Sequence, residues 1–240
     1  LKVAYSMDEE GVRIPRDAIY KILQGCSKDL KNATKINTIL VHNRLERISV
    51  LGDHLIRLFV SCASLNDAQQ VFLRIPKPSI YTWNAIISAH AKLGEESSAM
   101  ALFYRMMDKD HHIKPNRITF LTLLKKCHGC DPRARIEGMI LHDYIFRTEH
   151  IADVAILNTI IDMYAKCGCL TEAYSIFDKL PFKDLVTWSV MISGYAHLGF
   201  GLNALELLEK MIESGLQPCK ITYLSALKAC CNIQQVRYAH

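Results

Sequence analysis

A chain of 240 residues can form one or two globular domains, or a single array of repeats. Half of its residues are apolar, which suffices for a continuous core, but no apolar run reaches the roughly 18 residues of a membrane span. The formal net charge of +5 permits a polyanionic partner without requiring one.

The first two segments are predicted to be helical but irregular. Leu1 to Pro15 is typical of the tail of a second helix and its exit, so we expect neither a leader peptide nor a complete repeat there, and we expect the chain to be a fragment of a longer protein. Arg16 to Ile48 is a degenerate two-helix unit in which Asn43-Arg44 stands where a glycine turn is expected. Its predicted apolar positions are Ile19, Leu23 and Cys26 in the first helix and Ala33, Ile36, Ile39 and Leu40 in the second.

The clearest unit is VAILNTIIDMYAKCGCLTEAYSIFDKLPFKD, from Val154 to Asp184. Its apolar residues recur with the spacing of two amphipathic helices. Gly168 is expected to end the first helix in the left-handed conformation, and Pro181 to stop the second. A polar stripe of Asn158, Asp162 and Lys166 lies beside the apolar face of the first helix.

The same pattern recurs elsewhere without a gap. Ser49 to Ser79 aligns with this unit, and IYTWNAIISAHAKLG aligns with LVTWSVMISGYAHLG. The corresponding polar stripes are Asp53, Arg57, Ser61; Asn84, Ser88, Lys92; and Ser189, Ser193, His197. Repeats of this period predict an all-α solenoid of stacked helix–turn–helix units, in which each unit buries its apolar face against its neighbours.

The unit boundaries follow from this alignment. The predicted units after the first two segments are 49–79, 80–116, 117–153, 154–184, 185–219 and a truncated unit 220–240 that stops inside its second helix. In the unit 117–153, Pro132 is expected between the helices, and Leu123, Leu124, Cys127, Met139, Ile140 and Tyr144 are the expected apolar positions. Extra residues fall at Asp108 to His112. The cut repeats at both ends are expected to expose apolar surface.

The nine cysteines follow the repeats rather than a disulfide framework. Cys62 and Cys167 share one position, and Cys26, Cys127 and Cys230 share another. Recurrence at small packing positions predicts buried free thiols in a reducing compartment. Cys127 and Cys130 form a lone C-x-x-C without a second ligand pair, so we expect neither a metal site nor a cofactor.

At this level of detail the sequence resembles plant-type pentatricopeptide repeat (PPR) proteins. NTIIDMYAKCGCLTEAYSIFDKLPFKD resembles their short repeat, VTWSVMISGYAHLGFGLNALELLEKMIESGLQP their standard repeat, and ITFLTLLKKCHGC and ITYLSALKACCNIQQV their long repeat. The cycling of long, short and standard repeats resembles the PLS subclass. The resemblance implies one right-handed α-solenoid superhelix over residues 1–240, with 16–48 as a long-type repeat. A tetratricopeptide array, the main alternative, has more uniform repeats and lacks these motifs.

The resemblance also implies a function, which is sequence-specific binding of single-stranded RNA with one base per repeat. In this family the fifth and last residues of a repeat set the base preference. The implied base-reading pairs are Asn158 with Asp184, which suggests uracil; Asn84 with Asn116, which suggests a pyrimidine; and two off-pattern pairs, Ser189 with Cys219 and Asp53 with Ser79. The long repeats have Leu121 or Leu224 at the fifth position, and these are expected to read little.

Two further sets of residues are implied to contact RNA. Second residues of repeats, which family members place between neighbouring bases, are Val50, Tyr81, Ile118, Ala155 and Val186. Ordinary packing between repeats is the alternative for each. Stripe-end residues that could meet phosphates are Lys92, Lys166 and His197, for which plain solvation is the alternative.

The resemblance implies a mitochondrial or chloroplast protein that recognises sites for C-to-U RNA editing, with editing-complex proteins as further candidate partners. The deaminase of such proteins needs an H-x-E segment, which this sequence lacks, so we expect no enzyme activity in this chain; the alternative is a deaminase in a C-terminal part of a longer protein. We also expect neither a membrane partner nor a small-molecule substrate. The alternative function is a protein-binding helical-repeat scaffold, which the two off-pattern pairs keep open.

Overall fold

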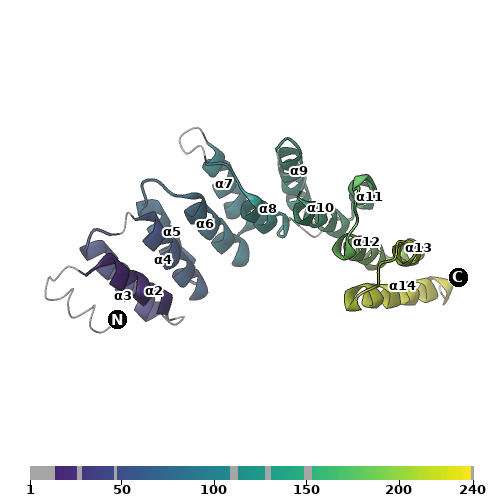
Figure 1. Cartoon of the computed structure of the whole chain (residues 1–240), viewed down its shortest axis with the longest axis horizontal. Helices are drawn as coiled ribbons and strands as arrows, with labels where there is room; N and C mark the ends of the chain where they lie inside the picture. The colour runs from purple at the N-terminus through teal and green to yellow at the C-terminus, as the bar shows by residue number, and fades with distance from the viewer. Residues whose placement is uncertain are drawn as a thin grey trace. The chain divides into compact units, whose positions relative to one another are not determined.

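The computed structural model describes residues 14–25, 29–45, 48–108, 113–127, 131–148 and 153–238. Every regular element in these ranges is an α-helix (Figure 1). Within the same ranges, no helix combines the length and the apolar character needed to cross a bilayer. The chain divides into two compact units, Leu1–Leu123 and Leu124–His240, which are described here one at a time.

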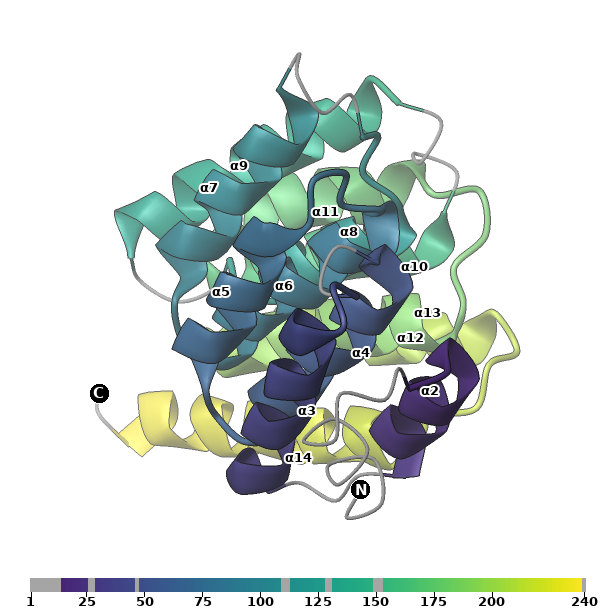
Figure 2. The ribbon, with the colours of Figure 1, turned by 90° about the vertical axis from the view of Figure 1, so that its left-hand side faces the viewer.

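The first unit is built from pairs of helices. Its helices are α2 (Arg16–Gly25), α3 (Leu30–His42), α4 (Ser49–Ser61), α5 (Leu65–Arg74), α6 (Ile80–Lys92), α7 (Glu96–Met107) and most of α8 (Arg117–Leu124). Helix α4 packs against both its own partner α5 and the next first helix, α6, and these three lie side by side in two views (Figures 1 and 2). Each first helix is therefore shared between two neighbouring pairs, as expected for a repeat array.

The second unit repeats this arrangement. Its helices are α9 (Pro132–Phe146), α10 (Val154–Lys166), α11 (Leu170–Lys179), α12 (Leu185–His197), α13 (Gly201–Glu213) and α14 (Lys220–Tyr238). Helix α10 packs on α11 and α12, and α12 packs on α13 and α14. The repeated tryptophans occupy equivalent core sites. The ring centroids of Phe72 and Trp83 lie 4.8 Å apart edge-on in the first unit, and those of Phe177 and Trp188 lie 5.0 Å apart in the second.

The described turns at Ala63, Gly94, Gly168 and Gly199, each between two paired helices, use one backbone conformation. Gly168 ends α10 with φ +78°, as its position predicts. The aligned residue in the first unit is Ala63, which adopts φ +56°. Arg44, at the expected glycine turn of the degenerate unit, adopts φ +55° and lies between α3 and α4, which belong to different pairs. The packing of the helix pair therefore imposes the left-handed turn even where a side chain makes it unfavourable.

Three expectations about the long repeats are wrong. Pro132 is the first residue of α9 rather than a residue between helices, a position where its missing N–H is also harmless. The buried face of α9 differs from the predicted one: Met139 and Ile140 are exposed, whereas Gly138, Leu141 and Ile145 are buried. Gly138 permits this close approach, because a Cβ there would lie 2.6 Å from the sulfur of Met163, which would have to shift.

The third error concerns the last segment. Lys220 to Tyr238 is one helix, α14, and does not contain the start of a second helix. The equivalent first helix of the earlier long repeat, α8, ends at Leu124. Its sequence continues with Gly129 and Pro132, whereas α14 contains neither glycine nor proline to interrupt its backbone hydrogen bonds.

The expectation for the thiols is only partly met. Cys127 is buried, Cys62 and Cys167 are half-buried, and Cys230 is exposed. Cys62 and Cys230 are free thiols. Repetition of a residue type thus did not imply equal burial. The residues of the predicted Leu1–Pro15 tail before Ile14, with Cys26, Cys130 and the stretch 109–112, lie outside the described residues.

Candidate nucleic-acid interface

The last residue of a repeat caps the first helix of the next one. Ser79 caps α6, and its Oγ accepts a hydrogen bond from the backbone N–H of Thr82 at 3.2 Å. Asp184 caps α12 in the same way, with its Oδ1 2.8 Å from the N–H of Thr187. At the start of α8, Asn116 Oδ1 accepts from the N–H groups of residues 118 and 119. Capping therefore fixes these side chains before any ligand is present.

Two of the four sequence-derived pairs are in direct contact through an amide. The Asn84 Nδ2 donates to Asn116 Oδ1 at 3.1 Å, across the interface between α6 and the start of α8. The Asn158 Nδ2 donates to Asp184 Oδ1 at 3.3 Å, between α10 and the start of α12. Both asparagines are nearly buried, with exposed fractions of 8% and 6%, so they lie at the floor of the surface rather than projecting from it.

Asp184 is held as a carboxylate. Burial by itself raises the pKa of a carboxyl group, but hydrogen bonds from the N–H and hydroxyl of Thr187, and then from Asn158, outweigh it and lower the pKa of Asp184. The ionised group is an acceptor only, which is why Asn158 presents an N–H to it.

The two off-pattern pairs differ from these. Ser189 Oγ lies 3.8 Å from Cys219 Sγ, a weak contact, and donates to the Leu185 carbonyl at 2.7 Å. Asp53 is 8% exposed, and its buried Oδ1 has no hydrogen-bond partner within the described part of the chain. Burial raises the pKa of Asp53, an effect that the Thr82 side chain and the Arg57 guanidinium reduce without cancelling.

The second residues of the repeats are exposed in spite of being apolar. Exposed fractions are 53% for Val50, 61% for Tyr81, 54% for Ile118 and 54% for Val186, while Ala155 is half-buried. Ile221 of α14, at the same position and not singled out from the sequence, is 63% exposed. Large apolar side chains left in water at regular intervals are candidates for contact with a ligand.

A cavity of about 430 Å³ in the first unit joins several of these features. Its lining includes Tyr81, Asn84 and Ile118, and two cationic side chains, Lys92 and Arg57. Two apolar walls, an amide and nearby positive charge are the groups that a stacked nucleotide with its phosphate would contact.

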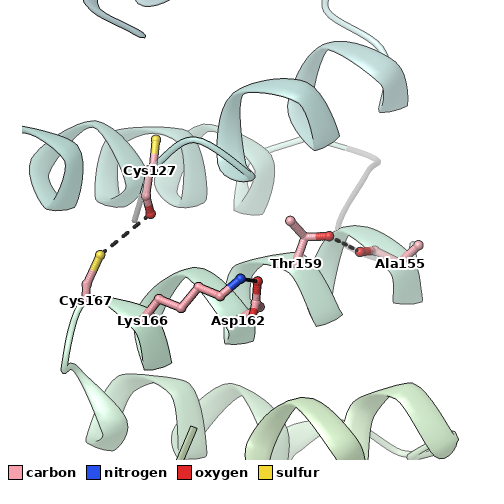
Figure 3. A network of polar contacts seen from close by, with 6 residues as sticks. All are labelled: Cys127, Ala155, Thr159, Asp162, Lys166 and Cys167. Atoms are coloured by element: carbon pink, nitrogen blue, oxygen red, sulfur yellow. Dashed lines mark hydrogen bonds and ion pairs between the residues drawn. The ribbon is translucent and has the colours of Figure 1, made fainter. Parts of the chain in front are cut away.

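The other two stripe-end residues have partners of their own. Lys166 forms an ion pair with Asp162 at 2.6 Å, on the same face of α10 as the Thr159 to Ala155 hydrogen bond (Figure 3). His197 Nδ1 lies 2.8 Å from Lys228 Nζ. A phosphate at Lys166 would therefore compete with an exposed ion pair, which is a weak interaction.

Sequence reasoning missed a set of buried threonines. Thr82, Thr119, Thr187 and Thr222 are each fully buried at the third position of a first helix. The Thr119 hydroxyl donates to Asn84 Oδ1 at 2.6 Å, and the Thr187 hydroxyl is 2.7 Å from Asn158 Oδ1. The signal was present, because I-Y-T-W, R-I-T-F, L-V-T-W and K-I-T-Y stand in register.

Among the described residues, no three His, Cys, Asp or Glu side chains gather closely enough to hold an ion.

Comparison with known proteins agrees with this arrangement. A model of the PPR repeat family matches residues 78–129 and 183–232, and a PPR repeat model matches residues 155–185. A chloroplastic pentatricopeptide repeat-containing protein of Arabidopsis thaliana is 32% identical over 91% of this chain and 35% of its own length. A mitochondrial one from the same plant is 30% identical over 87% of this chain and 33% of its own length. The chain thus spans about a third of these relatives.

Solved structures give the same fold. The maize pentatricopeptide repeat protein PPR10 matches 99% of this chain and 34% of its own with a TM-score of 0.71 at 20% identity. PPR10 in complex with an 18-nucleotide psaJ RNA element matches 99% of this chain and 35% of its own with a TM-score of 0.65 at 22% identity. These matches confirm the predicted all-α repeat fold. With family models covering more than half of the sequence, the chain belongs to the PPR repeat family.

Proposed function

We propose that this chain binds single-stranded RNA and reads individual bases with the side chains at the junctions between repeats. The observation that carries the proposal is the cavity lined by Tyr81, Asn84 and Ile118, with Lys92 beside it. An amide in the same cavity as two exposed apolar side chains can hydrogen-bond the edge of a base whose faces those side chains cover. The RNA-bound PPR10 structure supports the same ligand class.

The proposed readers fall into two grades. The pairs Asn84–Asn116 and Asn158–Asp184 are in hydrogen-bond contact and are proposed to prefer pyrimidines, with uracil at the second. The pairs Ser189–Cys219 and Asp53–Ser79 are proposed as weaker readers, because the first contact is long and the second pair is not joined by a hydrogen bond in the described structure.

The proposed cellular role is recognition of RNA editing sites in an organelle. The relatives are named as chloroplastic or mitochondrial, which supports an organellar protein. The PLS-like order of repeats in the sequence supports recognition of C-to-U editing sites, with editing-complex proteins as partners. In this proposal the chain supplies recognition and the deaminase chemistry comes from elsewhere.

The protein-binding alternative has one observation in its favour. An open, mainly apolar groove of about 850 Å³ lies among α9, α10 and α11, and its lining includes the exposed Met139 and Phe146. An exposed apolar groove can accept an amphipathic segment of another protein. This groove does not include the base-reading residues, so it can coexist with RNA binding.

The deciding experiment is an anisotropy titration of the chain with a randomised pool of short single-stranded RNA, followed by sequencing of the bound fraction. We expect pyrimidines to be enriched at two positions. Asn84→Ala and Asn158→Ala are each expected to remove the enrichment at one position and to leave the other, with a modest loss of affinity. Ser175→Ala on the exposed side of α11 is the control. An unselected pool, or enrichment that survives both substitutions, would favour the scaffold alternative.

A further inference from the structure

We propose that the buried threonine at the third position of a first helix orients the base-reading asparagine of the preceding repeat. Thr119 does this for Asn84, and Thr187 does it for Asn158. The inference rests on the proposed function, because it assigns a positioning residue to the same candidate interface.

The contacts at Asn84 form a closed ring. The backbone N–H of Asn116 donates to Thr119 Oγ1 at 3.1 Å, and the Thr119 hydroxyl donates to Asn84 Oδ1 at 2.6 Å. Asn84 Nδ2 then donates back to Asn116 Oδ1 at 3.1 Å. The hydroxyl has a single proton and two acceptors within reach, Asn84 Oδ1 at 2.6 Å and Asn116 Oδ1 at 3.2 Å, and the much shorter contact directs the proton to Asn84.

This ring determines which end of the amide faces which way. A carboxamide has an acceptor on one side and two donors on the other, and rotation by half a turn would exchange them. In Asn84 the exchange would place an N–H against the Thr119 hydroxyl proton and an oxygen against Asn116 Oδ1. The amide is therefore fixed with one Nδ2 hydrogen left for a ligand, which favours bases that present a carbonyl oxygen.

The second junction has the same arrangement, with the carboxylate of Asp184 in place of the amide of Asn116. The Thr187 hydroxyl lies 2.7 Å from both Asn158 Oδ1 and Asp184 Oδ1. Asn158 Nδ2 donates to Asp184 Oδ1 at 3.3 Å, so Asn158 Oδ1 faces the Thr187 hydroxyl, whose proton is shared between the two acceptor oxygens. Turning the amide round would place the Asn158 oxygen against the carboxylate at 3.3 Å, and this repulsion fixes the orientation of the amide.

The chain contains its own comparison for a purely structural role. The repeat 117–153 has Leu121 at the fifth position. The third position of α10, the first helix of the following repeat, is Ile156, which is fully buried. Helix α10 is capped normally by Asp153, which accepts from the N–H groups of Ala155 and Ile156. An aliphatic residue therefore fills this site and leaves the helix start intact, and the hydroxyl is present where the fifth residue is polar.

The test uses short fluorescent single-stranded RNAs that differ at one position, where each of the four bases is offered in turn. The position is the one at which Asn84→Ala removes the preference of the wild-type chain. Thr119→Val keeps the shape of the side chain without the hydroxyl, and it is expected to lower the preference for the favoured base by about fivefold or more, the effect of losing one hydrogen bond. Thr119→Ser is expected to restore it, and Thr187→Val to leave this position unchanged while weakening the other.

The outcomes separate the two proposals. If Asn84→Ala abolishes the preference but Thr119→Val retains it, the positioning role is refuted and base reading stands. If Thr119→Val lowers binding equally for all four bases, or Thr119→Ser fails to rescue, threonine acts on folding alone and the inference is also refuted. A wild-type chain that shows no base preference removes the proposed function, and this inference with it. Thr187→Val provides the same test at an independent junction if Thr119→Val does not fold.

Discussion

At the scale of single residues, the Oδ1 atom of Asp184 both caps helix α12 and accepts a hydrogen bond from the side chain of Asn158. Its Oδ1 accepts from the Thr187 N–H, the Thr187 side chain lies within 2.7 Å, and Asn158 donates at 3.3 Å. Since the folded pKa of Asp184 is lowered, the ionised carboxylate stabilises the folded chain above its unfolded pKa. That contribution is lost as the pH falls through the folded pKa.

Cys219 gives a prediction at this scale. Hydrogen bonds from the Thr222 hydroxyl and backbone N–H, with smaller contributions from Ser189 and the N–H of Ile221, lower its pKa to about 7 although burial opposes them. A thiol with that pKa is about half thiolate at neutral pH and reacts accordingly.

We therefore expect iodoacetamide labelling of Cys219 to rise through neutral pH, and Thr222→Val to move the midpoint upward. Mass spectrometry of the labelled peptides between about pH 5 and about pH 9 measures it, with the exposed Cys230 of α14 as the control for reagent access. A midpoint for Cys219 near the ordinary value of about 8.5 would contradict the prediction.

At the scale of elements, the same helix–turn–helix geometry is built from different residues. Gly168 and Ala63 occupy aligned turns, at φ +78° and +56°. The left-handed conformation costs a residue with a Cβ about 1 kcal/mol or more, and the interface between paired helices outweighs this cost.

Ala63→Gly is accordingly expected to stabilise the chain by up to about 1 kcal/mol, after the larger backbone entropy of unfolded glycine is subtracted from the relieved strain. Gly168→Ala is expected to destabilise it by about 1–2 kcal/mol. Urea unfolding measures both. The two changes in the free energy of unfolding need not be equal in size. A loss of stability in Ala63→Gly would show that the turn is not strained.

Close approach between helices depends on two glycines in the second unit. A Cβ at Gly194 of α12 would lie 2.7 Å from the Cβ of Ala165, which is fixed to the α10 backbone. A Cβ at Gly138 of α9 would meet the Met163 sulfur at 2.6 Å, but that side chain is flexible.

Gly194→Ala should therefore destabilise the chain by about 1–3 kcal/mol, because α10 and α12 must move apart. Gly138→Ala, the matched control, should cost clearly less because Met163 can change rotamer. Thermal unfolding by circular dichroism gives the order, and the reverse order would indicate that the α10–α12 interface adapts more easily than α9 does.

At the scale of the whole molecule, the charge is modest and the proposed phosphate contacts are few. The net charge is +5, and Lys92 and Arg57 line the cavity of the first unit, whereas Lys166 is engaged with Asp162. RNA affinity should consequently depend on salt through a small number of phosphates.

For two to three released counterions, we expect the affinity to fall about tenfold between about 50 mM and about 200 mM salt. Lys92→Gln should make this dependence shallower and leave the base preference unchanged. Anisotropy titrations at several salt concentrations check both. Affinity that does not respond to salt would mean that phosphates are not contacted.

The sequence by itself determined the class of fold, the pairing of helices and the family. Periodic apolar residues, the turn at Gly168 and the tryptophans in register all report local structure repeated many times, and repetition makes each prediction check the others. It also singled out Asn84 and Asn158. The sequence predicted the wrong buried face for α9 and a second helix that α14 does not contain. No other repeat in the chain showed the correct pattern for these two segments clearly.

Only the tertiary structure decided what surrounds those asparagines. The contacts Asn84–Asn116 and Thr119–Asn84 join residues far apart in sequence, and whether a hydroxyl reaches an amide oxygen at 2.6 Å depends on how closely α6 and α8 pack. The same is true of burial, since Tyr81 and Trp83 stand two residues apart in one helix, with Tyr81 61% exposed and Trp83 fully buried. Periodicity predicts which face a residue occupies, but the depth of that face and its hydrogen-bond partners are set by the neighbouring repeat.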